Sequence, residues 1–269
     1  MNPPHHPEPI GEPGFSGSER FSGSRPLLPA LAPKSPEAPP HRWGFGAFLL
    51  VEAVFLITSV FVVLPFKPVG GGPIPPVGLL VSLAAPTLLA AGVAVLATVL
   101  RGNGPLLDLR MEWRWPDVGL GLSIGLAGFV VTSVASTLWT KWVGPEHANS
   151  AVGSLLDGVH ASPAIAVLMF LHLWLVAPLC EEIIYRGLLW GAIERQHWGR
   201  WAPYALSTMI FAVAHLEPLR TPLLLVIAIP IGLGRMLTGR LVSSVIAHQL
   251  NNLLPALGIL LVSLGLMPG

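Results

Sequence analysis

The chain has 269 residues, of which 52% are hydrophobic and only 11% are charged. Soluble domains carry about 25% charged residues, so this composition excludes an ordinary soluble enzyme, whose surface needs solvated side chains. The net charge of +1 offers no basic surface for nucleic acid, and the single cysteine, Cys180, excludes a disulfide framework. The class that remains is an all-α membrane protein, a polytopic bundle of transmembrane helices.

The first 41 residues differ in composition from the rest of the chain. They contain 11 of the 28 prolines, with Gly, Ser and Glu between them. A segment of this kind buries too little apolar surface to fold by itself. We therefore expect residues 1–41 to form a disordered, proline-rich cytoplasmic tail, and residues 42–269 to form one transmembrane helical domain.

Seven apolar stretches follow, and about 20 residues of helix are needed to cross the hydrocarbon core of a bilayer. The stretches are residues 43–64, 77–100, 118–139, 163–194, 202–216, 222–237 and 242–264. The fifth and sixth are short. The sequence therefore predicts about seven spans and leaves six or eight open.

The distribution of Lys and Arg predicts the orientation of these spans. With the N-terminus in the cytoplasm, eleven of the 15 Lys and Arg residues lie on the cytoplasmic side and three on the outer side, while Arg186 lies inside a span. Cytoplasmic loops of membrane proteins are enriched in these residues. We expect a multi-pass protein of the cell membrane with its N-terminus inside, its C-terminus outside, and an odd number of spans.

Ionisable residues in the fourth stretch give the first indication of chemistry, because a charge inside a span is costly unless it faces the bundle or water. Glu181 and Glu182 are adjacent, and Arg186 follows Glu182 by one helical turn. Glu182 and Arg186 can therefore form an ion pair, whereas Glu181 points about 100° away. We expect Arg186 to keep Glu182 ionised and Glu181 to be free for proton transfer. A salt bridge that only fixes helix packing is the alternative.

Further polar residues lie in the fifth and seventh stretches. His215 follows Phe211 by one turn, and Asn252 follows His248 by one turn. At a rise of about 1.5 Å per residue, these side chains and Glu181 can meet at one level in the inner half of the bilayer. A carboxylate and an imidazole can activate water, and a His–Asn pair can stabilise an oxyanion. Each pair on its own also fits a polar contact between helices.

Other features of the spans indicate packing. Gly residues are separated by three positions at 121 and 125 and again at 187 and 191, a spacing that lets neighbouring helices approach closely. Glu52 lies inside the first span and fits a hydrogen bond between helices.

The three motifs together resemble those of the type II CAAX prenyl endopeptidase and bacteriocin-processing (CPBP or Abi) family of intramembrane proteases. That family has E-E-x-x-x-R, F-x-x-x-H and H-x-x-x-N/D on successive membrane helices. This chain has them at residues 181–186, 211–215 and 248–252, in the same order. The resemblance covers residues 160–269, which we expect to form the catalytic core of a bacterial-type hydrolase.

The resemblance implies a role for each matching residue. Glu181 and His215 would activate the water, and His248 and Asn252 would form the oxyanion site. Supporting roles would fall to Glu182, Arg186 and Phe211. The family is described as metalloproteases, and the side chains that could bind Zn²⁺ here are Glu181, His215 and His248. The same set also works without a metal.

The substrate that the resemblance implies is a membrane-associated peptide or protein, reached among membrane lipids. Two other functions fit the sequence. One is a non-catalytic scaffold or bacteriocin-immunity protein with the same fold, which a broken motif would favour. The other is a transporter or proton relay, which would predict interrupted helices in two corresponding halves.

Overall fold

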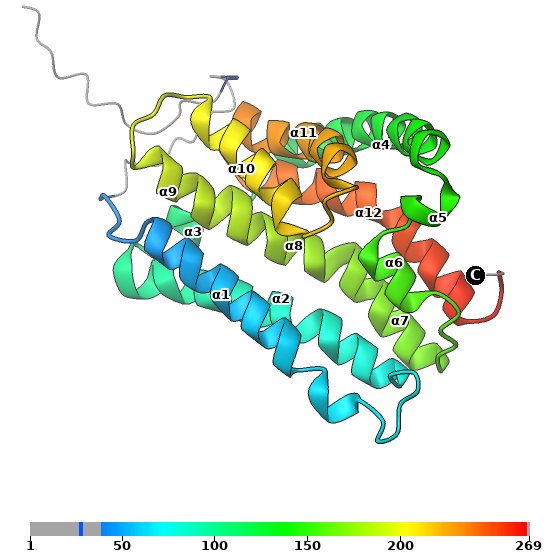
Figure 1. The fold of residues 1–269 in the computed structure, drawn as a ribbon. Coiled ribbons are helices and arrows are strands. Elements are labelled where there is room, and N and C mark those ends of the chain that lie inside the picture. The colour runs from blue at the N-terminus through cyan, green and yellow to red at the C-terminus, as the bar shows by residue number, and fades with distance from the viewer. Residues whose placement is uncertain (1–26, 29–38, 268–269) are drawn as a thin grey trace, which may run out of the picture.

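The computed structural model describes residues 27–28 and 39–267, and these fold as helices and connections without a strand (Figure 1). Six helices are long and apolar enough to cross a membrane. The all-α membrane fold expected from the sequence is therefore confirmed. The prediction of a disordered tail in residues 1–41 falls almost entirely outside the described residues.

The first three spans come from the N-terminal half. They are α1 (Phe45–Phe61), which a 3-10 turn extends to Phe66, α2 (Pro76–Arg101) and α4 (Trp115–Val143). The fourth span is one 32-residue helix, Pro163–Glu194. It consists of α7 (Pro163–Leu171), a π-helical segment (His172–Val176), α8 (Ala177–Glu182), a second π-helical segment (Ile183–Leu189) and α9 (Trp190–Glu194). The remaining long helices are α11 (Thr221–Thr238) and α12 (Val242–Ser263), and the short ones are α3 (Pro105–Asp108), α5 (Pro145–Ala148) and α6 (Ala151–Leu156).

The predicted fifth span, residues 202–216, is the shorter helix α10 (Ala202–Ala214) of 13 residues. It ends because Leu216 adopts a left-handed backbone conformation, with φ of 55°, directly after His215. This conformation is the usual way to stop a helix, although glycine adopts it more easily than leucine. The helix is about 20 Å long, so the count of seven spans holds only if α10 is included.

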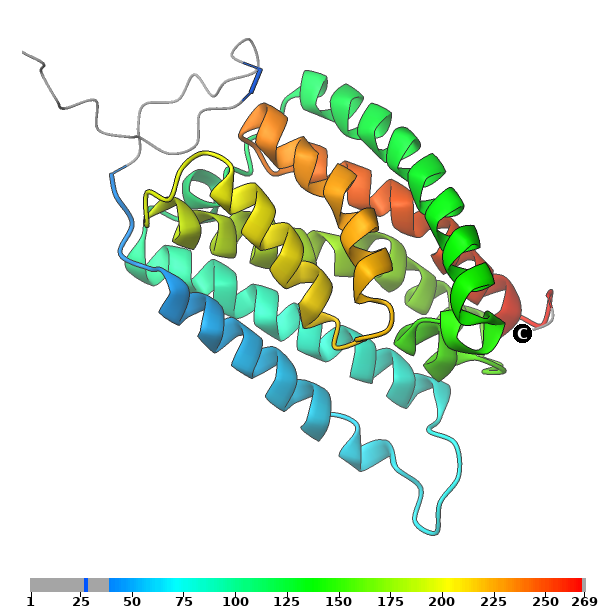
Figure 2. The same ribbon diagram turned by 45° about the horizontal axis from the view of Figure 1, so that its top comes forward.

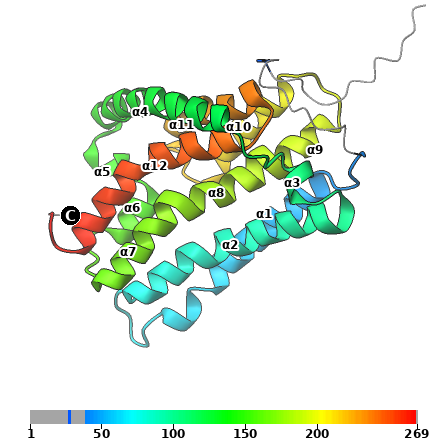
Figure 3. The same ribbon diagram turned by 180° about the vertical axis from the view of Figure 1, so that it is seen from behind.

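The long fourth helix lies at the centre of the bundle (Figures 1 and 3). Helix α12 packs along one side of it, and α2 packs along another, with α1 beside α2. Helix α10 contacts the α9 end, and α4 covers α11 and α12, as the turned view in Figure 2 shows. This arrangement brings α8, α10 and α12, which carry the three motifs, together around one helix.

Close packing at the glycines is confirmed. Cβ atoms added at Gly121 and Gly125 would lie 2.8 to 2.9 Å from atoms of α12, and one added at Gly191 would lie 2.4 Å from the Trp43 ring. These distances are too short for any Cβ, so α4 can approach α12 this closely only with glycine at these positions. The glycines therefore fix how α4 packs on α12 and how the start of α1 packs on α9.

The two ends of the described chain lie at opposite ends of the fourth helix. Arg195 Nη1 donates to the Trp43 carbonyl oxygen at 2.6 Å, and the Ala161 amide donates to the Ser263 carbonyl oxygen at 3.0 Å. The start of α1 thus meets the end of α9, and the end of α12 meets the start of α7 (Figure 1). The odd number of crossings and the direction across the membrane stay predictions.

A buried ion pair joins α4 to the connection between α11 and α12. Arg240 Nε lies 2.5 Å from Asp117 Oδ2, and Arg240 Nη2 lies 2.7 Å from Oδ1, with both side chains fully buried. The Ser243 hydroxyl adds a bond to the Asp117 carbonyl oxygen at 3.1 Å. A two-bonded pair of this kind fixes geometry as well as charge.

Candidate active site

The helix that carries the two carboxylates is irregular on both sides of them. The π-helical segments His172–Val176 and Ile183–Leu189 flank α8, which ends at Glu182. Pro178 lies inside this helix and has no N–H to donate to the preceding turn. Single-turn π segments widen a helix locally and occur frequently at functional sites.

Side chains of α12 bond to the carbonyl groups in the first π-helical segment. Gln249 Nε2 donates to the Leu175 carbonyl oxygen at 3.1 Å, and Asn252 Nδ2 lies 3.4 Å from the Leu173 carbonyl oxygen. Buried backbone acceptors need such partners. Two amide side chains therefore hold α12 in register with the carboxylate helix.

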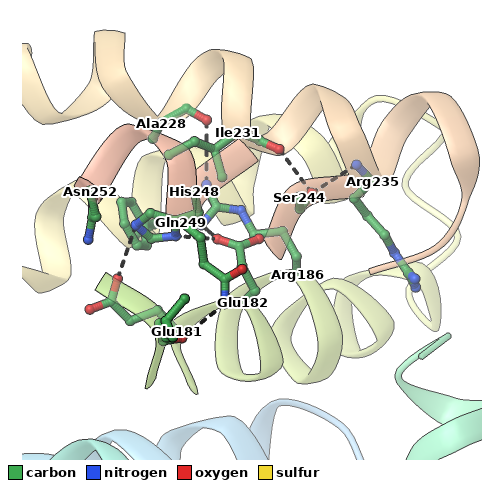
Figure 4. Close-up of polar contacts among 12 residues, drawn as sticks. Glu181, Glu182, Arg186, Ala228, Ile231, Arg235, Ser244, His248, Gln249 and Asn252 are labelled. Atoms are coloured by element: carbon green, nitrogen blue, oxygen red, sulfur yellow. Dashed lines mark hydrogen bonds and ion pairs between the residues drawn. The ribbon is translucent and has the colours of Figure 1, made fainter. Parts of the chain in front are cut away.

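Glu182 is the centre of the buried part of the site (Figure 4). Its Oε1 lies 3.0 Å from Arg186 Nη1, which is the expected ion pair, and 2.9 Å from His248 Nδ1 on α12. Glu182 and Arg186 are both fully buried. Because an ionised carboxylate only accepts hydrogen bonds, the Nδ1 atom of His248 carries the proton, and its Nε2 faces away from Glu182.

Glu181 lies on the other side of the same imidazole. Its Oε2 is 3.6 Å from His248 Nε2, and 23% of its side chain is exposed (Figure 4). This distance is too long for a direct hydrogen bond and suits a water that bonds to both groups. His248 is therefore flanked by two carboxylates, one buried and one accessible.

Phe211 on α10 joins the three motifs. Its ring lies 4.4 Å from the Arg186 guanidinium carbon, 4.7 Å from the His215 ring and 5.6 Å from the His248 ring. Tyr185 packs against its edge at 5.3 Å. An aromatic face stabilises a cation above it, so Phe211 holds Arg186 in place and sets the spacing between the two histidines.

His215 lies at the C-terminal end of α10, where its Nδ1 is 2.8 Å from the Phe211 carbonyl oxygen. A carbonyl oxygen can only accept, so Nδ1 donates and Nε2 is free as a base. From the sequence we expected Glu181 and His215 to act together on the water. In the structure, the imidazole within 4 Å of Glu181 is that of His248. His215 packs against the Phe211 ring, which also packs against His248 and Arg186.

The two asparagines of α12 face different helices. Asn251 Oδ1 accepts a bond of 2.8 Å from the Thr132 hydroxyl on α4, and Asn251 is buried. Asn252 is half-buried and faces the π-helical segment. Asn251 is therefore a packing contact, and only Asn252 shares a side of α12 with the carboxylate helix.

The side chains suggested as Zn²⁺ donors are Glu181, His215 and His248. Among the described residues, no three His, Cys, Asp or Glu side chains converge in a way that could hold a metal ion. The Nδ1 atoms of His248 and His215 bond to Glu182 and to a backbone carbonyl, and partners of these kinds also orient metal-bound histidines. Binding of Zn²⁺ stays a prediction.

One protein-family model matches the segment that contains these residues. Residues 163–254, from α7 to α12, match the family model described as Type II CAAX prenyl endopeptidase Rce1-like. The matched segment contains all three motifs, and the resemblance seen in the sequence is thereby confirmed. No curated protein and no solved structure matches the chain. The family match supports a CAAX-type intramembrane protease, a hydrolase that acts on a peptide or protein substrate in a membrane.

Proposed function

We propose that the protein hydrolyses a peptide bond of a membrane-associated peptide or protein inside the bilayer. The observation that carries this proposal is a chain of contacts among four ionisable groups. Arg186 lies 3.0 Å from Glu182, Glu182 lies 2.9 Å from His248, and His248 lies 3.6 Å from Glu181. All four lie in the segment that matches the protease family. A charged group of this kind is costly inside a membrane and is a functional site by default.

Activation of water falls to Glu181 and His215. Glu181 is the accessible carboxylate of the group, so water and substrate can reach it. Its partner Glu182 is bonded to Arg186 and His248, which leaves Glu181 as the carboxylate available for proton transfer. His215 offers its free Nε2 as a second base. A positioned base of this kind accelerates a reaction by about 100- to 10,000-fold.

The oxyanion that forms when water attacks the carbonyl is held by His248 and Asn252. His248 Nε2 lies on the side of the ring that faces the accessible Glu181. An N–H at this position can donate to the oxyanion. Asn252 uses one amide hydrogen on Leu173 and has a second to donate. Donors fixed in advance are the most effective stabilisers of such charge.

The supporting residues act by orientation. Glu182 holds the His248 ring by its Nδ1 in the way that a buried carboxylate orients a catalytic histidine. Arg186 keeps Glu182 ionised, and Phe211 packs against the Arg186 guanidinium. These contacts are buried. The residues that orient the site therefore lie apart from the side that the substrate reaches.

A comparison of membranes tests the proposal. Membranes that contain the wild-type protein or the Glu181→Gln variant are compared by proteomics of newly formed peptide termini. The expected result is a set of termini that depends on wild-type protein and disappears in Glu181→Gln, while Glu112→Gln, a change in the connection before α4, leaves it intact. The same termini in all three samples, or none in any, would leave a scaffold, an immunity protein or a transporter as the function.

A further inference from the structure

Helix α1 carries a carboxylate in its core-facing stripe. Phe45, Phe48 and Phe55 belong to this stripe, since Phe48 is buried in the main core and the other two pack against it. Glu52 falls between Phe48 and Phe55 at helical spacing, and it is half-buried. The carboxylate thus faces the bundle, where an ionisable group needs a polar partner.

The partners of Glu52 belong to the site. The Tyr185 hydroxyl donates a hydrogen bond to Glu52, and Glu52 also interacts electrostatically with His215. An independent contact fixes the same orientation. Phe48, one turn before Glu52, packs edge-on against the Tyr185 ring with centroids 6.1 Å apart. Helix α1 therefore presents Glu52 to the side chains of the second π-helical segment and of α10.

Tyr185 connects this carboxylate to the proposed base. It follows Glu181 by one helical turn, and its hydroxyl interacts electrostatically with both Glu181 and Glu52. Glu52, Glu181 and His215 are all half-buried, whereas Glu182 and Arg186 are fully buried. Glu52 is thus half-buried, like the groups proposed to activate water.

We propose that Glu52 is a positioning residue of the active site, which binds the Tyr185 hydroxyl and interacts electrostatically with His215. Because the Tyr185 hydroxyl donates its hydrogen bond to Glu52, it does not donate to Glu181. The oxygens of Glu181 therefore stay available to water and to His248. The carboxylate also interacts electrostatically with His215, the second base of the proposed reaction. This inference rests on the proposed function, since a positioning residue needs a reaction to serve.

The test uses full-length protein in nanodiscs and a peptide whose cleavage in membranes depends on Glu181. Glu52→Gln keeps the size of the side chain and an oxygen that can accept from Tyr185, but it removes the charge. We expect kcat to fall about 10- to 100-fold, the usual loss when an orienting partner is removed, with KM and Tm close to wild type. Glu52→Asp keeps the charge and should recover part of the rate.

Ser59→Ala is the matched control on the same helix, because the Ser59 hydroxyl donates to the carbonyl of Phe55 in its own helix. It should leave kcat unchanged. Wild-type kcat in Glu52→Gln, or a loss of rate that follows a loss of Tm, would overturn the role of Glu52 while Glu181→Gln remains inactive. If Glu181→Gln is as active as wild type, or if wild type cleaves nothing, the proposed function fails and this inference fails with it.

Discussion

Two fully buried ion pairs can be compared in this bundle. In one, Asp117 and Arg240 form two bonds that join α4 to the connection between α11 and α12. In the other, Glu182 and Arg186 are one turn apart on the same helix, and two more ionisable groups, His248 and Glu181, lie beside them. The first pair is matched in charge and geometry, while the second has a carboxylate and an imidazole left over.

The difference between the two ion pairs distinguishes a contact that only stabilises the fold from one that can also take part in a reaction. A buried pair whose members satisfy each other adds little net stability over apolar packing, but the loss of one partner is costly because it leaves a lone buried charge. Both pairs share this property. Only the second offers groups that can take up or release a proton without breaking the pair. Only the second has both of its residues in the segment that matches the protease family, since Asp117 of the first pair precedes it.

The largest effect is expected at Glu182, because this residue belongs to a buried ion pair and also orients a residue of the proposed reaction. Glu182→Gln leaves Arg186 without its counter-charge and replaces the carboxylate that accepts from His248 Nδ1 by a weaker, neutral amide oxygen. We expect a loss of about 3–5 kcal/mol in the free energy of unfolding, together with a loss of turnover per folded molecule. Chemical denaturation and a turnover assay on the folded fraction measure the two separately. A variant that keeps its stability would show that Glu182 is not the centre of the buried group.

The matched pair should behave differently. Asp117→Asn leaves Arg240 buried without a full counter-charge, so a loss of about 3–5 kcal/mol of stability is again expected. Turnover per folded molecule should stay near wild type, because Asp117 bonds to Arg240 and Ser243 and has no part in the proposed reaction. Inactive but folded Asp117→Asn protein would mean that the two ion pairs are coupled.

The third largest effect is expected at Asn252, on the accessible side of the site. Asn252→Ala removes one proposed oxyanion donor, which typically lowers turnover by about 100- to 1000-fold. Because the donor acts on the transition state, KM should change little. Steady-state kinetics in nanodiscs, with Tm of the same samples, separate this result from a loss of packing between α12 and the π-helical segment.

The smallest effect is expected one residue away. Asn251→Ala removes the bond from the Thr132 hydroxyl, a change of about 1 kcal/mol in stability. Turnover per folded molecule should be unchanged, since Asn251 faces α4. Equal losses of kcat at positions 251 and 252 would contradict the division between packing and catalysis on α12.

Helical spacing was sufficient to predict much of the site. The Glu182–Arg186 pair is local to one helix, so the interval of four residues predicted it, and the separation of Glu181 from that pair followed in the same way. The family motifs brought His215, His248 and Asn252 into the same hypothesis. The membrane fold followed from composition and from the length of the apolar stretches.

Contacts between distant segments could not be predicted in this way. His248 bonds to Glu182, 66 residues earlier, and Arg240 bonds to Asp117, 123 residues earlier. Which of two neighbouring carboxylates meets a histidine depends on how α12 is rotated, and single-residue spacing does not fix that rotation. The early end of α10 was also missed, because Leu216 adopts a conformation that is unusual for a residue with a side chain.

In the proposed reaction, Glu181 is the carboxylate left free for proton transfer. The most direct measurement is kcat and Tm of Glu181→Gln in nanodiscs, beside Glu182→Gln and wild type. We expect Glu181→Gln to lose at least about 100-fold in kcat and to keep the Tm of wild type, whereas Glu182→Gln should lose both activity and Tm. If Glu181→Gln unfolds as readily as Glu182→Gln, or turns over at the wild-type rate, this role of Glu181 is contradicted.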